Sequence, residues 1–155
     1  KQMNILGDLM TSLNKIINRK ILVGIPMQEE QDEEGKKKKA TNAQKLFWNS
    51  MGSPLKKIPS RKVLEPAIED KLDEIGEVLN KGVVLGLVIG QEAMDKAYNR
   101  AGLMALQACI NWFDNPKNNW APNSPHTIKQ KGSDSPLIDT GEMRKSITYI
   151  IEDKK

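Results

Sequence analysis

Hydrophobic positions recur every three or four residues in three stretches of the chain, which predicts amphipathic helices over residues 3–18, 64–79 and 92–113. Two short β-branched runs, residues 21–25 (ILVGI) and 147–151 (ITYII), predict strands. Pro26 should end the first strand because proline cannot donate to a sheet ladder. The pattern therefore predicts an α+β fold in one domain over residues 1–155, with central long helices and a small sheet of short strands from the N-terminal part and the C-terminus.

Shorter helices are predicted from polar residues that stand where helix N-caps are expected. Two of them have the three-residue spacing to Gln or Glu that marks a capping box, and the third precedes a first-turn proline. They are Thr41, Asp139 and Ser124, and they predict helices over residues 42–52, 141–146 and 125–130, respectively. Residues 53–61, which hold Pro54 and Pro59, are expected to form an extended connector.

Two other stretches allow two interpretations each. Glycines at 82, 86 and 90 either line one helix face for close packing or break the helix between Lys81 and Gln91, and we favour the break. The charged loop at 27–40 (MQEEQDEEGKKKKA) is either flexible or a hairpin with Gly35 at its turn and acids facing lysines.

Charge is unevenly distributed along the chain, whose formal net charge is +4. Residues 41–62 contain five basic residues and no acid, whereas residues 65–95 contain eight acids and two lysines. Nucleic-acid contact by the basic part, complementarity between neighbouring copies in an assembly, and ordinary solvated faces would each produce this pattern.

The residues that usually carry chemistry are scarce. A single cysteine, Cys109, forms no intrachain disulfide, fits a reducing interior such as a cytoplasm, and lies in an apolar helical pattern that predicts burial. The single histidine, His126, lacks a catalytic context, and KGSDS at 131–135 lacks the spacing of a phosphate loop. We therefore expect no enzyme, no cofactor and no metal site. No apolar run approaches the ~20 residues of a membrane span, and the first ten residues lack a signal-peptide layout.

Three segments, in order, resemble the head–tail joining proteins of tailed bacteriophages, also called neck proteins, tail-completion proteins or minor tail components. They are ILVGIP at 21–26 with ATNAQ at 40–44, residues 52–68 with GSP and IPSRKVLEPAI, and SPHTIKQKGSDSPLIDTGEMRKSITYII at 124–151. The resemblance extends from about residue 20 to the end, and the third segment is the most specific. Relatives often carry His-Glu-Phe-Gly where this chain has NSMG at 49–52, and Arg-Pro-Phe where it has RKV at 61–63.

The resemblance implies a non-enzymatic structural protein of the virion, assembled in the host bacterial cytoplasm as a ring of identical copies around the DNA channel. It implies head-completion or connector proteins and tail-tube or terminator proteins as neighbours, with non-specific contact to channel DNA and none to a membrane. A transient morphogenesis factor that is lost from the virion, or a basic nucleic-acid-binding module, are the alternatives.

Five residues of these segments are expected to be architectural or assembly positions. Pro59 should fix an extended approach to the long helix, Asp139 or Thr140 should cap a helix, and Gly141 should allow a tight turn. Arg61 is the candidate interface residue.

Overall fold

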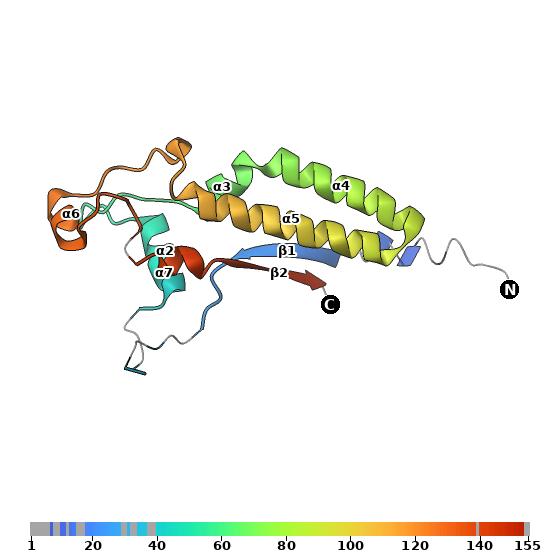
Figure 1. Cartoon of the computed structure of the whole chain (residues 1–155), viewed down its shortest axis with the longest axis horizontal. Helices are drawn as coiled ribbons and strands as arrows, with labels where there is room; N and C mark the ends of the chain where they lie inside the picture. The colour runs from blue at the N-terminus through green and yellow to red at the C-terminus, as the bar shows by residue number, and fades with distance from the viewer. Residues whose placement is uncertain are drawn as a thin grey trace.

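The structure is a computed structural model that describes residues 7, 10–11, 13–14, 18–28, 31, 34–36, 40–138 and 140–153. It confirms the predicted α+β class, with helices dominating the middle of the chain and one small sheet (Figure 1). In chain order the elements are β1 (Arg19–Gly24), α2 (Asn42–Met51), α3 (Leu64–Asp70), α4 (Leu72–Ile89), α5 (Gln91–Trp112), the 3-10 helix η1 (Pro116–Asn118), α6 (Pro125–Lys131), α7 (Glu142–Lys145) and β2 (Thr148–Asp153).

The sheet joins the two ends of the chain. β1 and β2 pair antiparallel, from Arg19 opposite Asp153 to Gly24 opposite Thr148. The strand predicted over 147–151 therefore begins one residue later and ends two residues later than expected. Ile147 is withdrawn from pairing because its side chain is buried in the core, where it is 4% exposed.

The α4–α5 pair runs antiparallel along one side of the sheet (Figure 1). The predicted break occurs at Gly90, whose φ of 108° is a conformation that side chains rarely allow. The alternative interpretation also holds, because Gly82 and Gly86 are buried against α5. A Cβ on Gly82 would overlap the Cβ of Ala97, and a Cβ on Gly86 would lie 2.8 Å from the Cβ of Met94. Close packing by two glycines therefore keeps α4 helical up to the third.

The single helix predicted over 64–79 is instead two helices, α3 and α4. Lys71 leaves helical geometry with φ −115° and ψ 9°, and its N–H donates to the carbonyl of Ile68 at 3.1 Å. Ala67 of α3 packs in one core cluster and Ile75 of α4 in another. The turn lets each helix bury its own residue against a different part of α5.

α2, α6 and α7 gather beyond the end of the sheet, on the side where α5 ends (Figure 1). The predicted capping box of Thr41 and Gln44 is confirmed, and the Ser124 side chain accepts from the N–H of Thr127 as the N-cap of α6. Residues 53–61 are not extended throughout, because Ser53 and Ile58 exchange two backbone hydrogen bonds of 2.8 and 2.9 Å that close a tight turn.

The larger core cluster lies where α2, α3 and α7 meet the end of α5. It comprises Leu46, Val63, Ala67, Cys109, Trp112, Phe113, Met143 and Ile147. A smaller cluster of Ile75, Ala101 and Ala105 lies between α4, α5 and the sheet. Cys109 is fully buried, as predicted.

Many residues of the predicted helix over 3–18 and of the charged loop at 27–40 lie outside the described residues. Those described between 7 and 18 are helical, as expected, but most of the predicted apolar stripe at 5–17 is not among them. In the 27–40 loop, Gly35 has a φ of 75°, and Glu34 and Lys36 form an ion pair of 2.5 Å beside it. A turn at Gly35 is therefore confirmed, while the acid–lysine pairing expected along the rest of a hairpin falls outside the described part. Within the described part of the chain, no helix combines the length and apolarity needed to cross a membrane.

Candidate functional site

A cavity of about 330 Å³ lies among α2, α6 and α7. Its walls come from three separate parts of the sequence. α2 contributes Asn42 and Lys45, the connector before α3 contributes Arg61, and the C-terminal part contributes residues between 123 and 143. Tertiary folding therefore brings together at one point residues that are up to about 100 positions apart.

The backbone around Arg61 is anchored by hydrogen bonds on both sides. The N–H of Arg61 donates to the carbonyl of Asn49 at 2.8 Å. The hydroxyl of Ser60 donates to the carbonyl of Ser50 at 2.5 Å, and the indole N–H of Trp120 donates to the carbonyl of Lys62 at 3.2 Å. These bonds fix where the Arg61 side chain enters the cavity wall.

The Arg61 side chain has an unusual environment for a cation. The residue is only 8% exposed, and its Nη2 donates to the backbone carbonyls of Ala121 and Pro122 at 2.8 and 3.3 Å. Its Nε is buried without an acceptor, and no carboxylate of the described residues pairs with it. Burial consequently lowers the pKa of the guanidinium from its ordinary value. A buried charge normally has a counter-charge, and the described residues provide none here.

Other cavity residues strengthen the positive potential. Lys45 and Lys131 line the same cavity as Arg61, and Glu142 is the acid among the described lining residues. The Nζ of Lys131 donates to the carbonyl of Ser135 at 3.3 Å. The site can therefore attract and orient an oxyanion.

The expected site residues cluster here, with one exception that lies outside the described part. Arg61, Thr140 and Gly141 line the cavity, and Pro59 lines an adjoining depression that Arg61 also borders. Asp139 falls on a position that the structure does not describe.

The structure corrects the predicted N-cap of α7. α7 has Gly141, not Asp139 or Thr140, at its N-cap, with a φ of 77°. The predicted tight turn at Gly141 is thus confirmed. The Thr140 hydroxyl accepts only a long hydrogen bond, 3.4 Å, from the N–H of Glu142.

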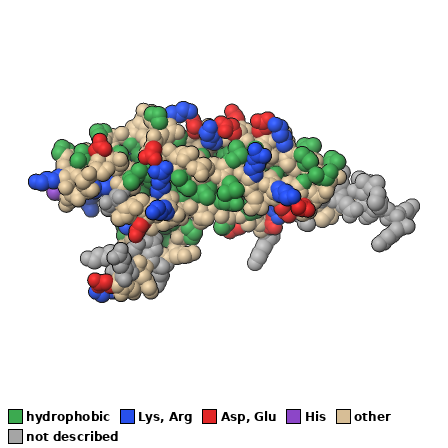
Figure 2. All heavy atoms as spheres, viewed as in Figure 1, with side chains coloured by type: hydrophobic (Ala, Val, Ile, Leu, Met, Phe, Trp, Pro, Cys, Tyr) green, Lys and Arg blue, Asp and Glu red, His purple; other side chains and the backbone are tan. Residues whose placement is uncertain are grey.

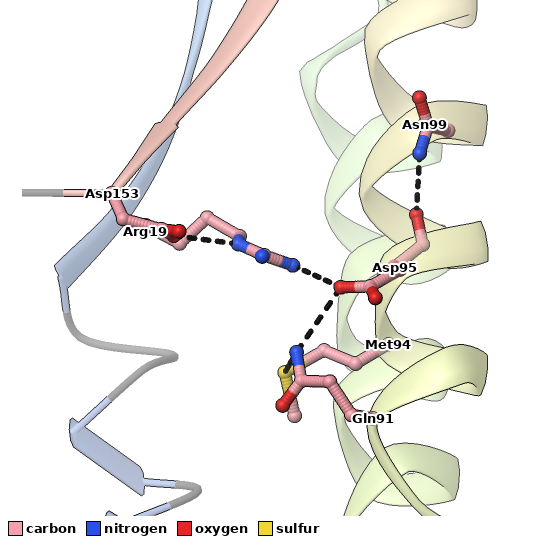
Figure 3. Close-up of polar contacts among 6 residues, drawn as sticks. All are labelled: Arg19, Gln91, Met94, Asp95, Asn99 and Asp153. Carbon is pink, nitrogen blue, oxygen red and sulfur yellow. Dashed lines mark hydrogen bonds and ion pairs between the residues drawn. The ribbon is translucent and has the colours of Figure 1, made fainter.

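A second arginine, Arg19, is partly buried and shows the opposite situation (Figure 3). Arg19 of β1 bonds to Asp153 of β2 at 2.8 Å and to Asp95 of α5 at 2.5 Å, and both bonds raise the pKa of its guanidinium. Gln91 donates to the same Asp95 carboxylate at 3.1 Å. This cluster ties the sheet to α5 and is already satisfied, so it is structural.

The remaining chemistry-bearing residues that the structure describes form no further site. His126 is exposed on the first turn of α6, and Cys109 is fully buried, where burial raises the pKa of the thiol to about 11. Among the described residues, no group of three histidine, cysteine or acidic side chains is arranged to hold a metal ion.

Sequence reasoning missed the polar residues that surround Arg61. The amides Asn42, Asn49 and Asn123 and the lysines Lys45 and Lys131 come from helices and loops whose proximity is tertiary. One signal was present: Lys45 and Arg61 both belong to the acid-free stretch 41–62.

Comparison with known proteins adds no relative: no family model, no curated protein and no solved structure matches the chain.

Proposed function

We propose that the chain is a structural virion protein of a tailed bacteriophage, a neck or tail-completion component that assembles as a ring around the DNA channel at the head–tail junction. In this proposal its neighbours are copies of itself, head-completion or connector proteins, and tail-tube or terminator proteins. In this proposal the chain has no catalytic activity, and it is built into the virion in the cytoplasm of the host bacterium.

The observation that carries the proposal is that the three family-like segments converge. Asn42 from the first, Arg61 from the second, and Thr140 with Gly141 from the third line one cavity. The first and third segments also pair as β1 and β2. Segments that were selected for their sequence resemblance alone thus form one contiguous part of the molecule, as expected if they encode a shared function.

Two exposed apolar surfaces supply contacts for assembly. One, the α2 surface, consists of α2 and the turn after it and comprises Phe47, Trp48, Met51, Leu55 and Ile58, from 43 to 99% exposed. The other, the α4 surface, is the end of α4 and comprises Val84, Leu85, Val88 and Ile89, from 49 to 79% exposed. They lie toward opposite ends of the molecule, and hydrophobic side chains gather at the α4 end in Figure 2. Two unlike surfaces on one chain suit the repeated head-to-tail contact of a ring.

The charges on α2 and α4 differ in sign. Lys45, Lys56 and Lys57 accompany the α2 surface, while Asp73, Glu74 and Glu77 lie on exposed positions in the first half of α4, before the α4 surface. Glu74 and Glu77 form ion pairs with Lys71 and Lys81 of the same chain. Charge complementarity therefore adds little to the apolar surfaces.

The direct test is mass spectrometry of purified virions, followed by electron microscopy of the head–tail junction at side-chain resolution. The expected result is a ring of this chain between connector and tail tube. Absence of the chain from mature particles but presence in assembly intermediates would support the transient morphogenesis factor instead.

Nucleic-acid binding is the alternative of a different class, and the lysines around the α2 surface favour it. It predicts binding of duplex DNA by the monomer that weakens steeply with salt. Replacement of Lys56 and Lys57 together with the 36–39 lysines by glutamine should then abolish the binding. Unchanged DNA affinity in that variant contradicts the alternative.

A further inference from the structure

The buried guanidinium of Arg61 lacks the partner that its chemistry requires. It is more than nine-tenths buried, it bonds to two backbone carbonyls, and its Nε has no acceptor among the described residues. Arg19, by contrast, has two carboxylates. Because a planar guanidinium matches a carboxylate through paired N–H donors, the missing partner has the chemistry of an oxyanion.

The surroundings favour a protein carboxylate over a nucleic-acid phosphate. The cavity of about 330 Å³ has room for a side chain, whereas a DNA duplex is too wide to enter it and would contact Lys56 and Lys57 of the adjoining depression instead. Ile58 of the α2 surface lines the adjoining depression, and Leu55, in the same turn, is 99% exposed. A basic cavity beside exposed apolar side chains suits an acidic protein segment, since a DNA backbone offers nothing to pack on them.

The chain itself contains such a segment. Residues 29–34 (EEQDEE) carry five carboxylates in six positions, and Met27 lies two residues before them. A head-to-tail contact in a ring needs a donor and an acceptor on every copy, and this sequence provides both.

We propose that the Arg61 cavity of one copy receives a carboxylate from residues 29–34 of the neighbouring copy. The inference rests on the proposed function, because the ring places identical copies side by side. Lys45 and Lys131 attract the acidic segment, and the guanidinium of Arg61 binds one of its carboxylates.

The test is binding of a fluorescent peptide of residues 27–35 (MQEEQDEEG) to the full chain, followed by anisotropy at low salt. The wild-type chain should bind this peptide but not the amide version MQQQQNQQG. Arg61→Met should weaken binding by at least about tenfold, because truncating one partner of a buried charge pair removes the pair. Arg100→Met removes the same charge from an exposed position on α5 and should leave binding unchanged.

Two further measurements cover loss of folding and the alternative ligand. If circular dichroism shows that Arg61→Met is unfolded, the double variant Lys45→Gln, Lys131→Gln is used instead, because it keeps Arg61. Its affinity for the peptide should be several-fold lower than that of the wild type. A 20-base-pair DNA duplex tests nucleic acid as the ligand. Equal peptide affinity in wild type and the cavity variants overturns the proposal, as does Arg61-dependent binding of the duplex without binding of the peptide.

A variant of the full chain tests whether the carboxylate comes from a neighbouring copy or from the same chain. When the five acids at 29–34 of the full chain are replaced by amides, the peptide should bind with unchanged affinity at protein concentrations where light scattering shows a monomer. A large gain in affinity would show that each chain fills its own cavity and would overturn the intermolecular contact. This assay needs only purified protein. A negative result would therefore overturn the contact between copies and would leave the proposed virion role to be decided by the virion experiment.

Discussion

Arg19 and Arg61 show how far the surroundings of one residue type determine its role. Arg19 holds Asp95 and Asp153 and stacks over the ring of Tyr98 at 5.2 Å, so it stabilises the contact between sheet and helix. Arg61 is bound by carbonyls alone, and burial lowers the pKa of its guanidinium. The described residues supply two carboxylates to Arg19, whereas they supply none to Arg61.

Cys109 gives a prediction at the same scale. Burial raises the pKa of its thiol from 9.0 to about 11, so the folded state holds the proton more tightly than the unfolded state does. The stabilisation is complete below about pH 9 and is lost as the pH rises toward 11, where the unfolded chain is ionised first. The free energy of unfolding in urea should therefore fall by up to about 2 kcal/mol more in wild type than in Cys109→Ala over this range. Parallel pH profiles of the two proteins would contradict the burial of the thiol.

Among the elements, α4 is the one whose existence depends most on its neighbour. Its sequence from 82 to 90 is unfavourable for an isolated helix because each interior glycine costs about 1 kcal/mol against alanine. Gly82 and Gly86 are nevertheless required, because they let α5 approach closely. Gly102 of α5 makes a similar contact on the opposite side, since a Cβ there would overlap the ring of Tyr149 of β2.

Two glycines of α4 provide a matched pair of substitutions. Gly82→Ala should lower the free energy of unfolding by about 2 kcal/mol, because the new methyl group meets Ala97 and the helices must separate. Gly76→Ala has no atom within 4 Å of the new methyl group and should raise it by about 0.5–1 kcal/mol through helix propensity. Urea unfolding of both variants is the measurement. Equal effects of the two substitutions would rule out the close α4–α5 contact.

At the scale of the whole molecule, the unusual feature is the amount of apolar surface that remains exposed at its ends. Trp48 is 54% and Met51 66% exposed on the α2 surface, and Val88 is 79% exposed on the α4 surface. Exposed apolar groups of this size are characteristic of contact surfaces. The core does not need these residues, so the proposed assembly can be tested separately from folding.

Replacement of Trp48 and Met51 by serine should weaken self-association by about tenfold or more, because aromatic and large apolar residues dominate contact energies. The free energy of unfolding of the monomer should change little. Light scattering over a range of protein concentrations measures the first quantity, and urea unfolding measures the second. Leu103→Ser, at a residue that is 56% exposed on α5, is the control for loss of an exposed apolar side chain. An equal loss of association in the control would show that general hydrophobicity is responsible.

The sequence by itself determined the elements whose signals are local. The three-and-four spacing marked α5 and the helical character of 64–79, the box of Thr41 and Gln44 marked the start of α2, and β-branched runs marked both strands. Burial of Cys109 followed from its place in an apolar helical pattern. These signals are carried by residues within a few positions of one another, so no knowledge of the fold was needed.

Only the tertiary structure decided the features that depend on distant partners. The turn at Lys71 follows from two core clusters that draw α3 and α4 apart, and the helix through Gly82 follows from the approach of Ala97. The cavity exists because Arg61 meets chain about 60 residues later, at Ala121 and Pro122. Arg61 could be named from its segment, but its buried and unpaired charge could not, since burial and pairing are properties of the space around a residue.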